Sequence, residues 1–193
     1  MHVADRSETA INVALYGVQD GVVGFDTEFS ESDRTDEGNV GEAEIRNDQW
    51  ALTKLCVVQV AIPSEVFIMP VKQIKAFPSE LQRVLESDEI VKAGVGLQTD
   101  GKIIFDAVGV EMRNLVDVGL LTKFSNVGSY LDTDQTPLGL ERCVQDVLKY
   151  KLDKTMQKES WNGMLTDAHW KYAGLDAQAS LEGFQPTGIA STV

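Results

Sequence analysis

Cysteine, histidine and basic residues are scarce in this chain of 193 residues, and long hydrophobic runs are missing. The two cysteines, Cys56 and Cys143, lie in apolar segments, which predicts reduced core residues; they are too few for a zinc site. No apolar run approaches the length of a membrane span, and the N-terminus lacks the basic-then-apolar pattern of a signal peptide. We therefore expect an intracellular protein with no membrane contact, and the sequence does not distinguish cytoplasm from nucleus.

The shortage of positive charge limits the kinds of partner. Seventeen Lys and Arg residues face thirty Asp and Glu residues, for a net charge of −13 and a pI near 4.5. This balance argues against a broad basic surface for nucleic acid. A phosphate-rich substrate would have to be held by local Lys or Arg, by bound metal, or by basic residues that oligomerisation brings together.

Length and pattern predict a single α/β domain over residues 1–193. Its core spans about 20–184, with an acidic, solvated loop at 30–49 and a flexible tail at 185–193. The loop adjoins the first strand, so a lid or an oligomer contact is an alternative to a plain surface loop. We expect a mixed sheet of about five strands, three antiparallel and then parallel, flanked by helices. The predicted strands are 22–29, 55–61, 66–71, 90–95 and 114–117, and the predicted helices are 7–16, 78–86, 99–107, 138–148 and 166–181.

Two carboxylates end the first apolar strand. Asp26 and Glu28 are two residues apart, so both side chains point to the same face of the strand. Two carboxylates at such a short distance repel each other unless a cation lies between them. The pair therefore favours a hard metal such as Mg²⁺ or Mn²⁺. On this fragment alone, two solvated acids at a strand end are the more common interpretation.

Two further acids and a tyrosine lie at element boundaries. Asp100 follows the strand at 90–95, where an acid commonly stabilises the first turn of a helix. Tyr172 and Asp176 are four residues apart and share one helix face. The small residues around them would let that helix approach a sheet closely; an ordinary amphipathic helix with an exposed acid is the alternative.

Taken together, these motifs resemble the DEDD-type 3′-5′ exonucleases of the ribonuclease-H-like fold, in particular the branch of the Werner syndrome helicase exonuclease and ribonuclease D. The matching motifs are GFDTEF at 24–29, KAGVGLQTD at 92–100 and YAGLDA at 172–177. The resemblance covers about residues 20–184. Connecting blocks also match: Gln59 within 55–61, the segments 114–117 and 138–140, and Trp161.

The resemblance implies a site and a chemistry. Asp26, Glu28 and Asp176 would bind one Mg²⁺ or Mn²⁺; Asp26 would bridge to a second ion, which Asp100 would support mostly through water. The Tyr172 hydroxyl would aim the attacking water. In the histidine subclass a His stands five residues before the last acid, where this chain has Lys171, so the tyrosine subclass (DEDDy) is implied. His169 is expected to be a partly exposed helix residue outside the site.

The implied activity is removal of nucleoside 5′-monophosphates from single-stranded RNA or DNA 3′ ends. Small stand-alone members of this class include ring-forming proteins, so a homo-oligomer is a further hypothesis. One alternative is a catalytically weak scaffold or interaction protein, which the net charge favours and the intact motifs disfavour. The other is a two-metal phosphohydrolase of the same fold that acts on nucleotides.

Overall fold

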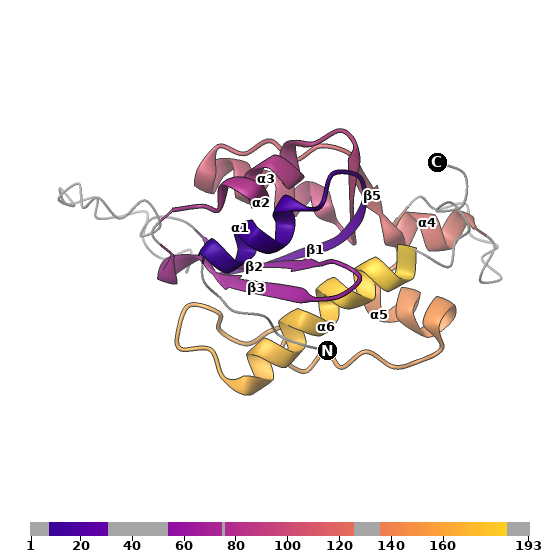
Figure 1. The fold of residues 1–193 in the computed structure, drawn as a ribbon. Coiled ribbons are helices and arrows are strands. Elements are labelled where there is room, and N and C mark those ends of the chain that lie inside the picture. The colour runs from indigo at the N-terminus through magenta and orange to yellow at the C-terminus, as the bar shows by residue number, and fades with distance from the viewer. Residues whose placement is uncertain (1–7, 31–53, 75, 126–135, 185–193) are drawn as a thin grey trace.

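The computed structural model describes residues 8–30, 54–74, 76–125 and 136–184. They form a five-stranded sheet in the order β3-β2-β1-β4-β5 (Figure 1). β1 pairs antiparallel with β2, and β2 with β3, whereas β4 runs parallel to β1, and β5 to β4. The predicted mixed α/β sheet is confirmed. The strands are β1 (Gly21–Phe29), β2 (Leu55–Ala61), β3 (Val66–Pro70), β4 (Ile90–Gly94) and β5 (Leu115–Asp117).

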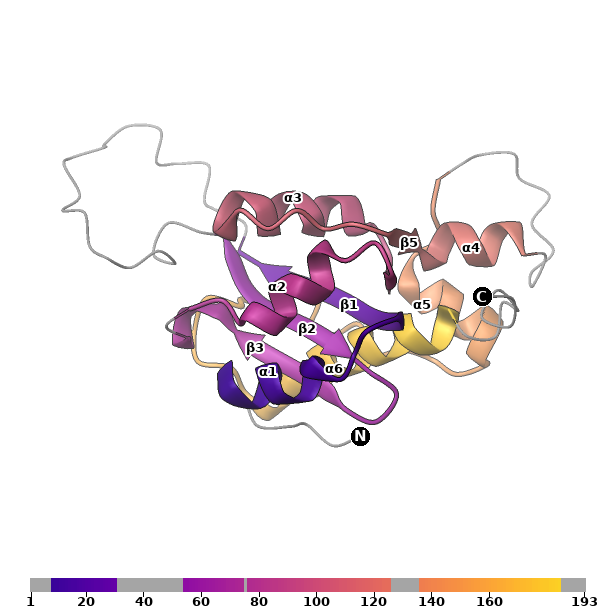
Figure 2. The ribbon, with the colours of Figure 1, turned by 45° about the horizontal axis from the view of Figure 1, so that its top comes forward.

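Helices cover both faces of the sheet. α1, α2 and α3 lie over one face and α6 over the other, with α4 and α5 near the C-terminal end of α6 (Figures 1 and 2). Both faces of the central strands are therefore shielded from water. The bounds are α1 (Glu8–Tyr16), η1 (Val71–Gln73), α2 (Ser79–Glu86), α3 (Leu97–Val108), α4 (Val118–Phe124), α5 (Leu140–Cys143), η2 (Val144–Leu148) and α6 (Asp167–Phe184).

β2 shows why the sheet needs both layers. All seven of its residues are buried, which is the pattern of a strand covered on both faces rather than on one. Leu55, Val58 and Val60 belong to the core under α1, α2 and α3, whereas Cys56 and Ala61 belong to the core under α6. Cys56 and Cys143 are both unpaired and buried, as expected.

α6 lies directly on β1. A Cβ atom added at Gly24 would stand 2.1 Å from the carbonyl oxygen of Ala177 and 2.8 Å from the backbone nitrogen of Leu181. Only a residue without a side chain fits there, and the small residues Ala173 and Gly174, both buried, line the same helix. The close approach predicted for this helix is confirmed.

A buried lysine ties α2 to the sheet. The Lys92 ammonium of β4 donates to the carbonyls of Val84 (3.1 Å), Ser87 (2.7 Å) and Ile90 (2.7 Å). Burial lowers its pKa to about 8. These acceptors include free carbonyls at the C-terminal end of α2, where a cation is favourable, so we assign Lys92 a structural role.

Several predicted bounds are wrong. The predicted helix 138–148 is divided into α5 and a π-helical turn, η2, and α3 begins two residues earlier than expected. α4 was not predicted; it follows β5 directly, and the Asp117 carboxylate caps it by accepting from the Leu120 amide at 2.9 Å.

Nearly all of the predicted acidic loop and the whole predicted tail lie outside the described residues. Within the described part of the chain, no helix is both long and apolar enough to span a bilayer.

We expect Gly24→Ala to destabilise the protein by about 2–3 kcal/mol, because the new methyl group must push α6 away from β1. Urea denaturation followed by circular dichroism measures this. Gly163→Ala is the matched control: Gly163 is exposed, a Cβ there meets no atom within 4 Å, and a change below about 0.5 kcal/mol is expected. Equal effects of the two substitutions would contradict the tight contact.

Candidate active site

A cavity of about 960 Å³ lies at the end of β1, between the sheet, α6 and the segment that precedes α6. Its lining is strongly acidic. Two lysines, Lys154 and Lys158, line it together with six carboxylates, those of Asp26, Glu28, Asp100, Glu141, Glu159 and Asp176. All five residues expected to form the site, including Tyr172, line this one cavity.

β1 and α6 bring three carboxylates together. Gly24, Asp26 and Glu28 alternate with Val23, Phe25 and Thr27 along β1, so the acids share the face that packs on α6. Asp176 lies one residue before Ala177, whose carbonyl abuts Gly24. One carboxylate oxygen of each of Asp26, Glu28 and Asp176 lies within 4.8 Å of the others. The predicted clustering of these acids is observed.

Asp100 approaches the cavity from the other side of β1. It lies in the first turn of α3, which begins after Gly96 at a φ of 73°, in the left-handed region that favours glycine. The Thr27 hydroxyl of β1 donates to its carboxylate, and the Gly96 amide donates to Asp117 at 2.9 Å. Asp100 is buried, and it lies outside the group of three carboxylates, so its contact with a metal stays a prediction.

Gln59 of β2 links the sheet to α6 at this point. With its amide oriented to satisfy both neighbours, its nitrogen lies 3.2 Å from the Ala173 carbonyl and 3.2 Å from Asp26 Oδ2. Gln59 is fully buried and pairs with Asp26 in the β1–β2 register. It therefore holds the carboxylate of Asp26 toward the cavity, a role that the matching block at 55–61 did not specify.

The ammonium group of Lys154 contacts both Tyr172 and Asp176, which the sequence analysis did not predict. Lys154 Nζ lies 2.6 Å from Asp176 Oδ2, 3.3 Å from the Tyr172 hydroxyl and 5.2 Å from the centre of its ring. Lys154 comes from the polar stretch 149–162, and no periodicity in that stretch points to a buried contact. The only signal in the sequence is a lysine seven residues before Trp161, within the matched region.

The carboxylates destabilise one another in the absence of bound metal. Burial, followed by the charges of Asp100, Asp176 and Glu28, raises the pKa of Asp26 well above its usual value. Burial and the charge of Asp176 raise the pKa of Glu28 to about 8. Burial also raises the pKa of Asp100, and the hydrogen bond from the Thr27 hydroxyl opposes this rise. Burial likewise raises the pKa of Asp176, and the Lys154 ammonium opposes it.

These observations fit a divalent cation. Among the described residues, Asp176 Oδ1 is a buried acceptor without a hydrogen-bond partner, and a buried unpaired carboxylate oxygen is costly unless a ligand satisfies it. Oxygen donors are the ligands that Mg²⁺ and Mn²⁺ prefer. The residues that would hold such an ion are Asp26, Glu28 and Asp176.

The expectation for His169 is partly wrong. It is only 8% exposed, because Trp161 packs edge-on against its ring at a centroid distance of 4.9 Å. Thr166 also contacts it, with Oγ1 2.7 Å from Nδ1. The segment before α6 folds back onto that helix and covers the histidine, which residue types alone do not reveal. His169 does not line the cavity.

Comparison with known proteins identifies the family. A family model described as 3′-5′ exonuclease matches residues 2–185. A candidate 3′-5′ exonuclease of Acanthamoeba polyphaga mimivirus is 24% identical over 86% of this chain and 40% of its own length. The bifunctional 3′-5′ exonuclease and ATP-dependent helicase WRN of Mus musculus is 29% identical over 74% of this chain and 10% of its own length.

A solved structure shows the same fold. RNase D of Trypanosoma brucei, in a complex with RNA U12, superposes with a TM-score of 0.73 at 18% identity, over 97% of this chain and 62% of that chain. The chain belongs to the 3′-5′ exonuclease family, of DEDD type and with the ribonuclease-H-like fold. It spans less than half the length of the two curated relatives that it matches.

We expect Glu28→Gln to stabilise the chelator-treated protein more at pH 8 than at pH 5.5. The pKa of Glu28 is raised from 4.5 to about 8 in the folded state. The folded protein therefore holds this proton more tightly, and wild-type stability falls as pH rises from about 4.5 to about 8, above which the effect levels off. Glutamine cannot ionise, and its advantage should grow by about 1–3 kcal/mol in urea denaturation. Glu89→Gln, at an exposed position outside the cavity, is the control. An advantage that does not change with pH would contradict the buried repulsion.

Proposed function

We propose that this chain is a metal-dependent 3′-5′ exonuclease of the tyrosine subclass, which hydrolyses single-stranded nucleic acid from the 3′ end and releases nucleoside 5′-monophosphates. The observation that carries the proposal is the group of three carboxylates within 4.8 Å, next to a buried tyrosine, at the end of a large cavity. Membership of the 3′-5′ exonuclease family supports it.

Each carboxylate has a role in this proposal. Asp26, Glu28 and Asp176 hold one divalent cation, and Asp26 together with Asp100 holds a second. Two such cations, when bound, neutralise the scissile phosphate, lower the pKa of the attacking water and stabilise the leaving 3′-oxygen. Gln59 and Thr27 orient Asp26 and Asp100 through the hydrogen bonds described above.

Tyr172 orients the attacking water in the proposed mechanism. Burial and the charge of Asp176 raise the pKa of its phenol, so it stays protonated at neutral pH and is a poor proton acceptor. Its hydroxyl is therefore assigned to hydrogen bonding and not to proton removal. Trp161 packs at 5.9 Å from the Tyr172 ring and restricts its position.

The acidic character of the chain favours short single strands over long duplexes, because a long duplex needs an extended basic surface. The structure of trypanosome RNase D contains RNA U12, which supports nucleic acid as the class of ligand.

The two buried cysteines form no disulfide, in keeping with a reducing, intracellular environment. We also propose that the chain forms a homo-oligomer, which light scattering would test.

Degradation of 5′-labelled single-stranded RNA and DNA tests the proposal directly. We expect a ladder of 3′-shortened products with Mg²⁺ or Mn²⁺ and none with chelator, and the preferred strand identifies the sugar. Asp26→Asn should remove nearly all activity, about 100-fold or more, since it removes a charged ligand. It should keep its circular dichroism spectrum. No ladder from the wild-type protein on either strand would favour the scaffold alternative, and release of product from free nucleotides alone would favour a nucleotide phosphohydrolase.

Tyr172→Phe separates the tyrosine from the metal ligands. Removal of one hydroxyl should lower kcat by about 10- to 100-fold, as expected for loss of a single group that positions the nucleophile. Mn²⁺ affinity in isothermal titration calorimetry should stay within about twofold of wild type, because the carboxylates remain. An unchanged kcat, or a large loss of Mn²⁺ affinity, would contradict the assigned role.

A further inference from the structure

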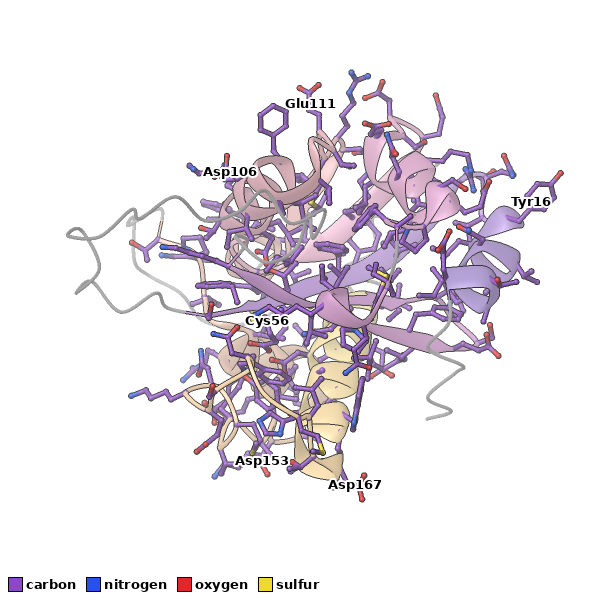
Figure 3. The ribbon with its side chains drawn as sticks, turned by 90° about the vertical axis from the view of Figure 1, so that its left-hand side faces the viewer. Tyr16, Cys56, Asp106, Glu111, Asp153 and Asp167 are labelled. Atoms are coloured by element: carbon purple, nitrogen blue, oxygen red, sulfur yellow. The ribbon has the colours of Figure 1, made fainter. Side chains whose placement is uncertain are left out.

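The Lys154 ammonium contacts Asp176, one of the three carboxylates grouped at the cavity. Its side chain is 20% exposed, against 3% for the side chain of Asp176, with which it forms an ion pair. It belongs to the segment before α6, which lies on the α6 side of the sheet: Figure 3 shows its neighbour Asp153 on that side, opposite Asp106 of α3. The ammonium is therefore held between α6 and the cavity.

The ammonium has a donor to spare. A lysine carries three N–H donors and no acceptor, and the contacts found among the described residues use two of them, on Asp176 Oδ2 and the Tyr172 hydroxyl. Lys154 also lines the cavity and is part exposed. The remaining donor is available to a ligand that enters the cavity.

The contacts with Asp176 also leave a metal position open. Lys154 binds Oδ2, whereas Oδ1 of the same carboxylate is buried and without a partner among the described residues. One carboxylate can thus accept from the lysine through one oxygen and bind a cation through the other. Metal binding does not require the ion pair to break.

The cavity needs a positively charged side chain such as Lys154 if its ligand is a phosphodiester. Its lining carries six carboxylates and two lysines, of which Lys158 is exposed and Lys154 touches the cluster. A phosphate brings further negative charge next to Asp176. A charge-assisted hydrogen bond from an ammonium is among the strongest single contacts that can offset this charge.

We propose that Lys154 binds a non-bridging oxygen of the substrate's terminal phosphodiester, and of the 5′-monophosphate product, while it keeps its contacts with Asp176 and Tyr172. This inference rests on the proposed function and assigns the protein's own phosphate-binding cation. It explains how an acidic chain holds a phosphate at this site without a basic surface.

Binding of product tests the inference without turnover. AMP and dAMP are titrated into the wild-type protein and into Lys154→Met at saturating Mn²⁺ by isothermal titration calorimetry. Loss of one charge-assisted hydrogen bond should weaken monophosphate binding by about tenfold or more. Lys154→Arg should recover most of the loss. Lys151→Met, at an exposed position on the same segment and outside the cavity lining, should stay within about twofold of wild type.

A separate Mn²⁺ titration without nucleotide distinguishes phosphate binding from mere support of Asp176. If Lys154 only supports Asp176, Lys154→Met should lose Mn²⁺ affinity but bind monophosphate normally once Mn²⁺ is saturating, which would overturn the inference. Lys154→Gln provides a second uncharged variant if the methionine variant does not fold. Failure of the wild-type protein to bind either monophosphate would overturn the proposed function itself, whereas equal binding by wild type and Lys154→Met overturns only the role of Lys154.

Discussion

The contact between β1 and α6 is the constraint on which the site depends. Gly24 lets the helix backbone rest on the strand, and a single added Cβ would stand 2.1 Å from the Ala177 carbonyl. The neighbour of Ala177 in the sequence is Asp176, and Asp26 lies two residues beyond Gly24 on the same strand face. The absence of one side chain thus sets the distance between acids that are 150 residues apart in the chain. A larger residue at this position would leave the helix able to shield the sheet, but it would move the Asp176 carboxylate away from the pair on β1. Packing and chemistry are therefore set by the same contact.

The electrostatics of the site oppose folding, and that is informative about function. Burial raises the pKa of each of the four acids, and those of Asp26 and Glu28 are raised further by the neighbouring carboxylates. A fold selected for stability alone would replace such a cluster with apolar or neutral residues. Its presence in a cavity, with an Asp176 oxygen that has no hydrogen-bond partner among the described residues, is better explained by a cation that binds the folded protein and offsets the repulsion. Thr27 contacts Asp100, Lys154 contacts Asp176, and Gln59 contacts both Asp26 and Glu28, so these side chains hold the metal ligands in place before the cation binds.

The sequence predicted the parts of the site that follow local rules. Alternation along a strand placed Asp26 and Glu28 on one face, and helical spacing placed Tyr172 near Asp176; both arrangements are observed. The mixed sheet also followed from strand spacing, since a short connection implies an antiparallel pair and a helix between strands implies a parallel one. Lys154 and the burial of His169 were missed, because both depend on how the segment before α6 folds back onto that helix. No period of two or 3.6 residues records a long-range contact of that kind. The division of the predicted helix 138–148 into α5 and η2 was missed for a related reason, since tertiary packing overrides a continuous apolar pattern.

The net charge of the chain is a poor guide to what this cavity binds. A charge of −13 argues against sequence-independent binding of long nucleic acids, but that argument concerns the whole surface. Beyond about one Debye length, roughly 10 Å, charges on the exposed surface are screened, whereas partly buried charges at a site are not. Two divalent cations carry four positive charges, which would neutralise the carboxylates of Asp26, Glu28, Asp100 and Asp176, and the Lys154 ammonium beside them would leave this part of the cavity net positive. An acidic exterior combined with a locally positive, metal-loaded centre would exclude non-specific binding along a strand while still accepting its end. That combination suits an enzyme that engages one terminal phosphodiester at a time.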